Sequence, residues 1–304
     1  MMKKGTVISL EKGKYEITGF IGEGAYGVVW EARRIPDGEI FALKTVQFRD
    51  ERGIYSFQQK EAVIGKLEIE IAFLKKFSAE ESLAHHIVPL VDSGIYEEKP
   101  VMVMMRCDHN LNTVYGKRVK NSQTFPFDAQ TFLDWIAQTA KALLKIHSTQ
   151  TEDKSEDRIY ALRDLKFDNV LCKDSNLYLS DFGTVKPIRR KLNLTGSIGC
   201  TPEWAAPEML IPAAYENHEV KYSFSPKVDI YALGLMMYAL ITGKPTAAQK
   251  LLGQYLLVKQ IELKYGEVGG LTGEERQILR ENLWRLFSAG GGTVGFGAEK
   301  ICTL

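Results

Sequence analysis

Four short clusters of residues occur in a fixed order along the chain, and this order constrains the fold more than any other feature. The first is a glycine-rich segment, Gly22-Glu23-Gly24-Ala25-Tyr26-Gly27-Val28-Val29, and the second is Phe41-Ala42-Leu43-Lys44. The third, Arg163-Asp164-Leu165-Lys166-Phe167-Asp168-Asn169, precedes Asp181-Phe182-Gly183. A single cluster could arise by chance, but the four in this order and spacing indicate phosphoryl-transfer chemistry.

The composition indicates a folded chain without strong electrostatic bias. Its 304 residues, 45% hydrophobic and 25% charged, suffice for one two-lobed domain or two small ones. A formal net charge of +1 gives no sign of a surface for nucleic acid or an anionic membrane. Glu11 and Lys12 interrupt the apolar run of the basic N-terminus, so no export signal is expected.

The cysteines support a reducing compartment. They have no CxxC spacing, which argues against a zinc site or a disulfide framework. They are Cys107, Cys172, Cys200 and Cys302. We therefore expect a cytoplasmic protein that binds neither nucleic acid nor membrane.

The first hundred residues predict a small β-rich lobe. The segment Tyr15–Val46 is rich in strand-forming residues, and Pro36-Asp37-Gly38 marks a hairpin turn within it. Apolar residues recur at helical spacing in Lys60–Phe77, with Glu70 near the inward stripe. Strands are expected at Ile87–Val91 and Pro100–Met105, which gives five strands in all.

Two features divide these last strands and close the lobe. The pair Ser93-Gly94 and the charged Glu97-Glu98-Lys99 read as the turn region between Ile87–Val91 and Pro100–Met105. Beyond Asp108 the pattern changes to a helical one, so the lobe is expected to end near this point.

The remainder of the chain predicts a mostly helical large lobe. One helix is expected to begin after Asp128 as its N-cap. Its apolar stripe consists of Phe132, Trp135, Ile136, Ala140, Leu143 and Leu144. The apolar run Ala232–Thr242 is too short to span a bilayer and reads as a buried core helix. The stretches Val119–Phe127 and His147–Arg158 read as surface loops.

The first two clusters fit phosphate binding. Glycines at 22, 24 and 27 between two strands let the backbone approach a polyanion, since glycine has no side chain to hold the phosphates away. A dinucleotide-binding loop would need a helix next, whereas Val28 to Ala32 continues as a strand. Lys44 is expected to neutralise the non-transferred phosphates. Glu70 is its expected partner, and Glu68 is the alternative on another helix face.

The third and fourth clusters fit the transfer step. Asp164 supplies a carboxylate to orient the attacking hydroxyl, and Asn169 an amide oxygen for a metal. Lys166 is expected to stabilise charge on the transferred phosphoryl group. Asp181 follows a strand and can bridge Mg²⁺ to the phosphates, while Phe182 packs and Gly183 permits the turn.

These residues resemble the eukaryotic-type Ser/Thr protein kinases, and the likeness continues through Ala206-Pro207-Glu208 and Asp229-Ile230-Tyr231-Ala232-Leu233-Gly234. It covers roughly residues 15 to 245. The resemblance implies an α+β, bilobal protein kinase-like fold that uses ATP and Mg²⁺, with Mn²⁺ as a substitute. Lys166 together with Thr201-Pro202 implies Ser or Thr acceptors in protein substrates.

The resemblance also assigns the ATP site. Ala42, Val29 and Leu171 would enclose the adenine, Met104 would be the gatekeeper, and the hinge would run from Met105 to Cys107. The catalytic set would be Lys44, Glu70, Asp164 and Lys166, and the metal ligands Asn169 and Asp181. The residues expected at ATP are Ile21, Gly22, Glu23, Gly24, Ala25, Tyr26, Gly27, Val28, Val29, Ala42, Lys44, Met104, Met105, Cys107 and Leu171.

With Arg163 directly before the catalytic Asp164, the sequence resembles kinases whose activation segment is ordered by phosphorylation. A buried guanidinium favours a dianionic partner, and Thr195 and Ser197 are the candidate phosphosites. One departure from the family is Leu162, which stands where a histidine usually precedes the Arg-Asp pair. We expect Leu162 to pack in an apolar column made by Leu74, Leu90, Leu162 and Phe182.

A second departure is the C-terminal region, which looks abbreviated. A plausible helix at Arg276–Phe287 is followed by a glycine-rich stretch, and Arg280 or Arg285 is the expected partner of Glu208. We expect lobes at 1–106 and 107–289, together one kinase domain of about 15–289, and a tail at 290–304. The alternatives are a pseudokinase that binds nucleotide or partners without turnover, and a small-molecule kinase of the antibiotic- or choline-phosphorylating type.

Overall fold

The structure is a computed structural model of the chain. It describes residues 2–24, 27–35, 37–48, 57–121, 127–150, 159–188, 192–195, 199–210, 214–216 and 219–243. Several predictions lie outside these residues: the loop tip Ala25-Tyr26, the phosphosite Ser197, and everything predicted beyond residue 243. The last group comprises the helix at Arg276–Phe287, the glycine-rich tail and the partner of Glu208.

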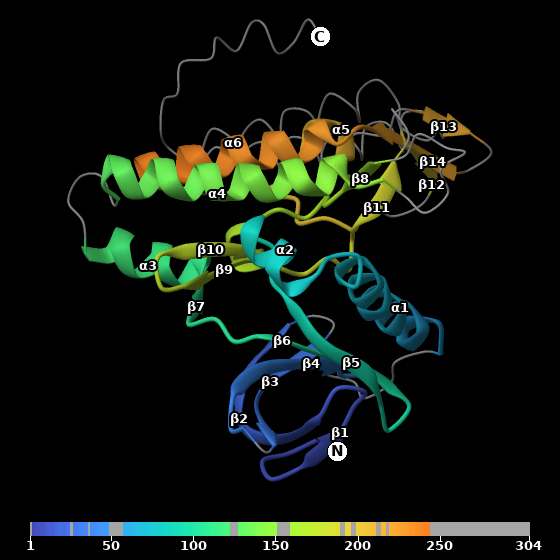
Figure 1. The fold of residues 1–304 in the computed structure, drawn as a ribbon. Helices are drawn as coiled ribbons and strands as arrows, with labels where there is room; N and C mark the ends of the chain where they lie inside the picture. Colours follow the sequence, from blue (N-terminus) through green and yellow to red (C-terminus); the bar gives the residue numbers. More distant parts are fainter. Residues whose placement is uncertain are drawn as a thin grey trace, which may run out of the picture.

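The first hundred residues form a curved antiparallel sheet, as Figure 1 shows. The strand order is β1-β2-β3-β4-β6-β5. The strands are β1 (Val7–Ser9), β2 (Lys14–Gly24), β3 (Gly27–Ile35), β4 (Ile40–Val46), β5 (Leu90–Tyr96) and β6 (Lys99–Met105). The hairpin turn predicted between β3 and β4 is present, and Gly38 adopts a φ of 79° there. This positive φ explains the glycine.

The sheet has six strands where the sequence predicted five, because β1 adds an N-terminal edge strand that pairs Val7 with Glu16 of β2. A buried carboxylate then joins the two edges of the sheet. Asp92 of β5 accepts hydrogen bonds from the Lys12 N–H (2.9 Å) and the Tyr15 hydroxyl (3.1 Å). Burial and the adjacent Asp92 raise the pKa of Tyr15 to about 12. The β1–β2 turn therefore closes the curved sheet against β5.

The boundaries of β5 also differ from the prediction. The strand begins at Leu90 and passes through Ser93-Gly94, which the sequence analysis took for a turn. The glycine serves close packing instead, since a Cβ at Gly94 would lie 3.0 Å from a methyl of Leu10. The turn lies at Glu97-Glu98, in the charged part of the predicted turn region, where φ is 47° and 62°. Residues 87–89 instead reach the large lobe, where Ile87 bridges to Leu179.

Two helices separate β4 from β5 and lie between the sheet and the large lobe. Helix α1 (Phe57–Leu74) begins and ends three residues earlier than predicted, and α2 (Ala79–Ala84) follows it. The buried side of α1 comprises Val63, Leu67, Glu70, Phe73 and Leu74. The predicted inward position of Glu70 is therefore confirmed, and Glu68 is exposed.

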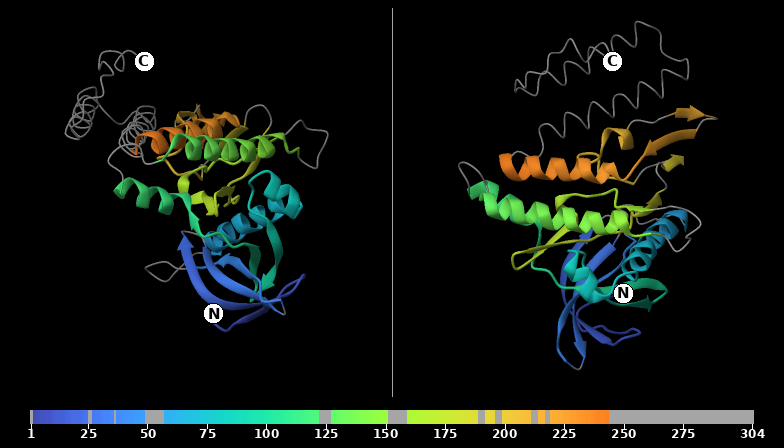
Figure 2. Two further views of the ribbon diagram at one scale, coloured as in Figure 1. Left: turned by 60° about the vertical axis from the view of Figure 1, so that its left-hand side comes forward. Right: turned by 45° about the horizontal axis from the view of Figure 1, so that its top comes forward.

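The large lobe contains long helices over small sheets. Its helices are α3 (Leu111–Asn121), α4 (Ala129–Ser148), α5 (Pro207–Leu210) and α6 (Lys227–Thr242). Asp128 caps α4 as predicted, because its side chain accepts the Thr131 N–H at 2.8 Å. Helices α4 and α6 lie side by side in both views of Figure 2. Of the helices in the described part of the chain, none has both the length and the hydropathy of a membrane span.

One predicted core residue is wrong. Leu144 is 69% exposed, whereas its neighbour Leu143 is 1% exposed. The reason is that α4 packs against α6, β8 and β10 through Thr139, Ala142, Leu143 and Ile146, and Leu144 lies on the opposite side. The apolar helix α6 is likewise buried on one side only, since Ile230 is 52% exposed. Helix α4 also extends to Ser148, into the predicted loop at 147–158.

Short strands carry the site and the segment after it. They form three sheets, in the orders β10-β9-β7, β11-β8 and β12-β14-β13. Their bounds are β7 (His109–Asn110), β8 (Ile159–Ala161), β9 (Val170–Lys173), β10 (Asn176–Leu179), β11 (Lys186–Ile188), β12 (Leu192–Thr195), β13 (Ala214–Glu216) and β14 (Glu219–Phe224). A single 3₁₀ turn, η1 (Phe167–Asn169), precedes β9. The pairing of β12 with β14 joins two segments that lie before and after α5.

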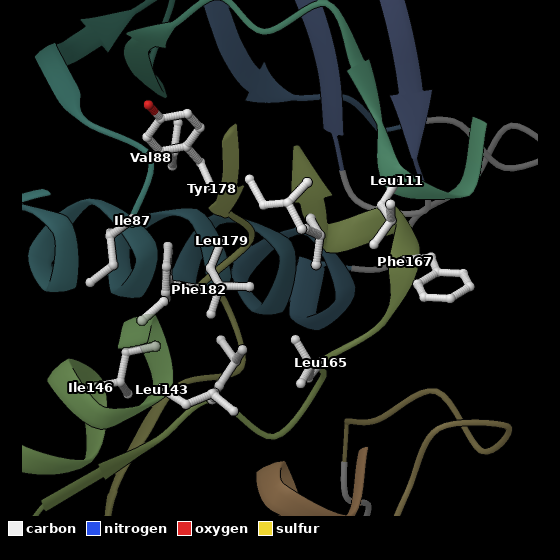
Figure 3. Packing of buried hydrophobic residues seen from close by; sticks show 14 of the residues in the cluster. Ile87, Val88, Leu111, Leu143, Ile146, Leu165, Phe167, Tyr178, Leu179 and Phe182 are labelled. Carbon is white, nitrogen blue, oxygen red and sulfur yellow. The ribbon is translucent and has the colours of Figure 1, made fainter. Parts of the chain in front are cut away.

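The main hydrophobic core lies beneath the site. Figure 3 shows Ile87, Leu179 and Phe182 near Leu143 and Ile146 of α4. The residues of the expected apolar column belong to this cluster: Leu74, Leu162 and Phe182 are all 0% exposed, and Leu90 is partly buried against the cluster. Phe73, which the sequence analysis left out, stacks on Phe182 with ring centroids 5.0 Å apart. Leucine at position 162 therefore fills an apolar space.

Candidate active site

The phosphate-side residues form one ion-paired group. Lys44, on β4, donates to Glu70 Oε2 of α1 at 2.7 Å and to Asp181 Oδ1 at 3.2 Å. The Glu70 side chain is 2% exposed and that of Asp181 is 46% exposed. The ion pair expected between Lys44 and Glu70 is thus present, and the alternative Glu68 is not involved. A buried pair of this kind fixes the lysine while leaving Asp181 accessible.

The local backbone explains how Asp181 reaches Lys44. Asp181 has a φ of 62°, a left-handed conformation that is uncommon for non-glycine residues. This bend sends Phe182 into the core, where it is 0% exposed. Gly183 has no positive φ; a Cβ there would lie 3.1 Å from the Lys66 carbonyl oxygen of α1. The expected turn is present, since the Val185 N–H donates to the Phe182 carbonyl oxygen at 3.0 Å, and glycine at position 183 suits the close packing on α1.

The three charges shift one another's pKa values in a definite order. Burial raises the pKa of Glu70, and Lys44 only partly opposes this, so the pKa lies above its usual 4.5. Burial acts the same way on Asp181, but the charge and hydrogen bond of Lys44, together with the charges of Lys166 and Lys66, outweigh it and lower the pKa below 3.8. Burial disfavours the charge on Lys44, yet the two carboxylates outweigh it and raise the pKa. On acidification Glu70 therefore gains a proton before Asp181.

The acceptor-side residues form a second group around Asp164. Its Oδ2 accepts Lys166 Nζ at 2.7 Å, and its Oδ1 accepts the Thr201 N–H at 2.9 Å and the Thr201 hydroxyl at 2.7 Å. Lys166 Nζ also donates to the Thr201 hydroxyl at 2.7 Å. The side chain of Asn169 donates to the Asp164 carbonyl oxygen at 2.9 Å. Asp164 is thereby fixed by donors from both its own loop and the segment before α5.

A buried aspartate of α6 supports this loop from below. Asp229 is 1% exposed, and its carboxylate accepts the Leu162 and Arg163 N–H groups at 2.8 and 2.7 Å. His147 of α4 lies 2.8 Å from the same carboxylate. Arg163 needs this support, because its φ of 75° is strained for a non-glycine residue. Asp229 therefore sets the backbone position one residue before Asp164.

The sequence pattern of the protein kinase domain matches residues 15–266. The chain belongs to the protein kinase family. It is 26% identical over 235 residues to "Probable serine/threonine-protein kinase nek2" of Dictyostelium discoideum, which covers 76% of this chain and 49% of the relative.

Two further relatives come from other eukaryotes. One is "Aurora kinase" of Eremothecium gossypii, 26% identical, with 78% of this chain and 55% of the relative covered. The other is "CBL-interacting serine/threonine-protein kinase 15" of Arabidopsis thaliana, 26% identical, with coverage of 87% and 55%. This kinase chain thus spans about half the length of these relatives. The family resemblance and the bilobal kinase-like fold predicted from the sequence are confirmed.

The glycine-rich residues of this kinase lie on the hairpin formed by β2 and β3. Gly22 pairs with Val29 and Gly24 with Gly27 across the β2–β3 hairpin. A Cβ at Gly27 would lie 2.8 Å from the Thr45 carbonyl oxygen, so this position tolerates no side chain. Gly22 and Gly24 have no such contact within the described residues.

The residues expected to enclose the adenine lie on three strands: Val29 on β3, Ala42 on β4 and Leu171 on β9. Ala42 pairs with the expected gatekeeper Met104 of β6. Both Ala42 and Met104 are buried. Burial raises the pKa of Cys107 to about 11, so its thiol stays protonated. The roles of these residues, like those of Ile21, Glu23 and Val28, stay predictions.

Asn169 and Asp181 fit the expected Mg²⁺ by their chemistry. A carboxylate and an amide oxygen are ligands that Mg²⁺ prefers. The two residues are held together, because the Asn169 carbonyl oxygen accepts the N–H of Ser180, directly before Asp181, at 2.9 Å. The Asn169 amide nitrogen bonds to Asp164, so the amide oxygen is the atom able to bind a metal. In the described residues no cluster of three His, Cys, Asp or Glu side chains forms a separate metal site.

Sequence reasoning missed two supporting residues. Thr201 was read only as a sign of the Ser/Thr branch, although it bonds both Asp164 and Lys166. Asp229 was read only as part of the family likeness. No local signal marks either one, since Thr201 lies 37 positions from Asp164 and Asp229 lies 66 from Arg163.

Of the residues in the regulatory hypothesis, Arg163 and Thr195 lie in the described part of the chain. Arg163 is 6% exposed, and its Nη1 donates to the Thr184 carbonyl oxygen at 3.0 Å. Thr195 ends β12, where its register partner is Lys221 of β14. A role for Thr195 as a phosphosite stays a prediction.

Proposed function

We propose that this chain is an active protein serine/threonine kinase that transfers the γ-phosphoryl group of MgATP to protein hydroxyls. The observation that carries the proposal is the junction of Asp164, Lys166 and Thr201. Transfer to a hydroxyl acceptor needs a carboxylate beside a cation. The Thr201 hydroxyl forms hydrogen bonds with both the Asp164 carboxylate and the Lys166 ammonium group. The names of the Dictyostelium and Arabidopsis relatives, both serine/threonine-protein kinases, support the same acceptor chemistry.

The proposed mechanism divides the work between the two groups of residues. Lys44, held by Glu70, neutralises the phosphates that stay behind. Mg²⁺ bound by Asn169 and Asp181 would supply charge neutralisation between the phosphates. Asp164 orients the acceptor hydroxyl and takes its proton as the new O–P bond forms and the bond to the leaving ADP oxygen breaks. Lys166 stabilises the charge on the transferred phosphoryl group.

Two further statements belong to this proposal. Autophosphorylation in the activation segment, at Thr195 or Ser197, would follow from the same hydroxyl chemistry. We also propose a cytoplasmic site of action, supported by cysteines that lack disulfide or zinc spacing.

The alternatives are less well supported. A pseudokinase is suggested by Leu162, but this residue only fills an apolar space at 0% exposure, and the charged residues above it are ion-paired. A small-molecule kinase would share the Asp164, Asn169 and Asp181 logic. The contact of Thr201 with Asp164 and Lys166 favours a protein acceptor.

The test is Mg²⁺-dependent transfer from labelled ATP by the wild type and by Asp164→Asn. Acceptors are the protein itself, a generic basic protein, and a panel of aminoglycosides and amino alcohols, with modified residues mapped. We expect only the wild type to label Ser or Thr. Transfer to small molecules alone would favour the small-molecule kinase, and nucleotide binding without transfer would favour the pseudokinase.

A further inference from the structure

Five aromatic side chains form a continuous row in the large lobe, here called the aromatic row. Each ring lies close to the next, with centroids 4.8, 4.9, 6.4 and 5.1 Å apart from one end to the other. The members, in spatial order, are Trp204, Phe167, Tyr115, Phe127 and Trp135. They come from the segment before α5, the catalytic loop, α3, the residue before the Asp128 cap, and α4. The row therefore links elements that are distant in sequence.

The end of the row at Trp204 joins the two arms of the acceptor site. Phe167 directly follows Lys166 and lies three residues after Asp164, and it is 1% exposed. Trp204 lies three residues after Thr201, and the backbone N–H of Trp204 donates to the Thr201 carbonyl oxygen at 3.0 Å. The Phe167–Trp204 contact thus closes a ring with the bond from the Thr201 hydroxyl to Asp164.

Helix α3 holds the catalytic-loop side of this contact. Tyr115 packs on Phe167, and one helical turn earlier the Asn112 side chain donates to Asp168 Oδ1 at 2.9 Å. Two successive residues of the 3₁₀ turn η1 are thereby fixed to one helix. Figure 3 shows Phe167 on the same side of the core as Leu111, the first residue of α3, and apart from Phe182. Because α3 holds Phe167 and Asp168 in place, we expect a displacement of Trp204 to move Thr201 rather than the catalytic loop.

We propose that Phe167 and Trp204 are positioning residues for the acceptor, which hold Thr201 against Asp164 and Lys166. The inference rests on the proposed function of this site. Loss of the Trp204 ring would release Thr201 without touching Lys44, Glu70 or the nucleotide strands. A displacement of about 1 Å at a reacting group costs on the order of a hundredfold in rate. Acceptor turnover should suffer while nucleotide binding does not.

The row itself offers a matched control. Trp135 is also a partly buried tryptophan and ends the row on α4, where its ring neighbour is Phe127. Trp204→Leu and Trp135→Leu make the same chemical change at the two ends. Trp204→Phe keeps a ring against Phe167 and serves as the rescue variant.

The experiment measures KM and kcat for a protein acceptor, the affinity for MgADP, and amide hydrogen exchange. For Trp204→Leu we expect acceptor kcat/KM to fall between about tenfold and a hundredfold with MgADP affinity unchanged. Exchange should quicken in residues 199–206 and 164–169. Trp135→Leu should change neither, and Trp204→Phe should restore most of the acceptor kcat/KM. If Trp204→Leu does not fold, Phe167→Leu removes the same contact from the other side.

Two results would overturn the inference. One is an equal effect of the two leucine variants on acceptor kinetics, and the other is unchanged exchange at 199–206 in a folded Trp204→Leu. If the wild type transfers no phosphate, the proposed function fails, and the exchange comparison still decides whether Trp204 positions Thr201. Failure of the two proposals is therefore distinguishable.

Discussion

The hydroxyl of Thr201 makes the sharpest single test of the acceptor site. Thr201→Val removes this hydroxyl but keeps the branched shape of the side chain. Two hydrogen bonds are lost, one donated to Asp164 Oδ1 and one accepted from Lys166 Nζ, each 2.7 Å long. Hydrogen bonds to charged groups contribute about 1.5–3 kcal/mol each.

The two losses should not simply add. Lys166 still reaches Asp164 directly at 2.7 Å, and the Thr201 N–H still donates to Asp164 at 2.9 Å. We therefore expect a net loss of about 2–3 kcal/mol in transition-state stabilisation. This corresponds to a fall of roughly 30- to 150-fold in acceptor kcat/KM.

Steady-state kinetics with a protein acceptor measure this effect, with the affinity for MgADP as a second readout. Thr201→Ser keeps the hydroxyl and should stay within about threefold of the wild type. The affinity for MgADP should be unchanged in both variants, because Thr201 contacts neither Lys44 nor Glu70 among the described residues. A Thr201→Val protein that keeps a third of the wild-type kcat/KM would refute the reasoning. So would an equal loss in Thr201→Ser.

Three further outcomes are expected. Because the pKa of Glu70 is raised and that of Asp181 is lowered, acidification should break the Lys44–Glu70 pair first. The acid limb of the pH profile for kcat/KM of ATP should therefore lie above pH 4.5. The Glu70→Gln variant should have lower activity and lack this limb. An identical limb in the variant would contradict the reasoning. Leu162→His should keep activity within about tenfold in a kinase assay, since the change affects packing worth roughly 1 kcal/mol, and abolished activity would show that the apolar column is misassigned. Tyr115→Phe should raise the free energy of unfolding by about 1 kcal/mol in urea titrations, because its buried hydroxyl has no hydrogen-bond partner among the described residues; a destabilised variant would reveal a partner.

The candidate site residues could be predicted because phosphoryl transfer restricts the residue type at each position. Lys44 and Glu70 illustrate this, since a cation in a strand needs a carboxylate on the inward face of the next helix, and periodicity alone places Glu70 there. The sequence could not reveal Thr201 as a partner of Asp164, because that contact depends on how the later segment folds back.

The errors in the fold have similar physical causes. Strand β1 is three residues long and gains stability only by pairing with β2, so no local pattern marks it. Gly94 looked like a turn residue, but its need for space becomes visible only when Leu10 lies over it. Leu144 and Leu143 are adjacent in the helix, and the packing of α4 on α6 decides which one is buried. In each case the local structure or burial is decided by a residue that is distant in sequence.

The N-terminal strand has a practical consequence for all these measurements. The family pattern begins at residue 15, whereas the sheet already begins at Val7. A protein trimmed to the family boundary would lose Ile8 from the inner core and the Lys12 N–H from Asp92. It would also leave β2 with an open edge, which invites pairing between molecules. Weak phosphoryl transfer by such a shortened protein would reflect aggregation rather than the chemistry of the site. The protein used in these assays should therefore include residues 2–14.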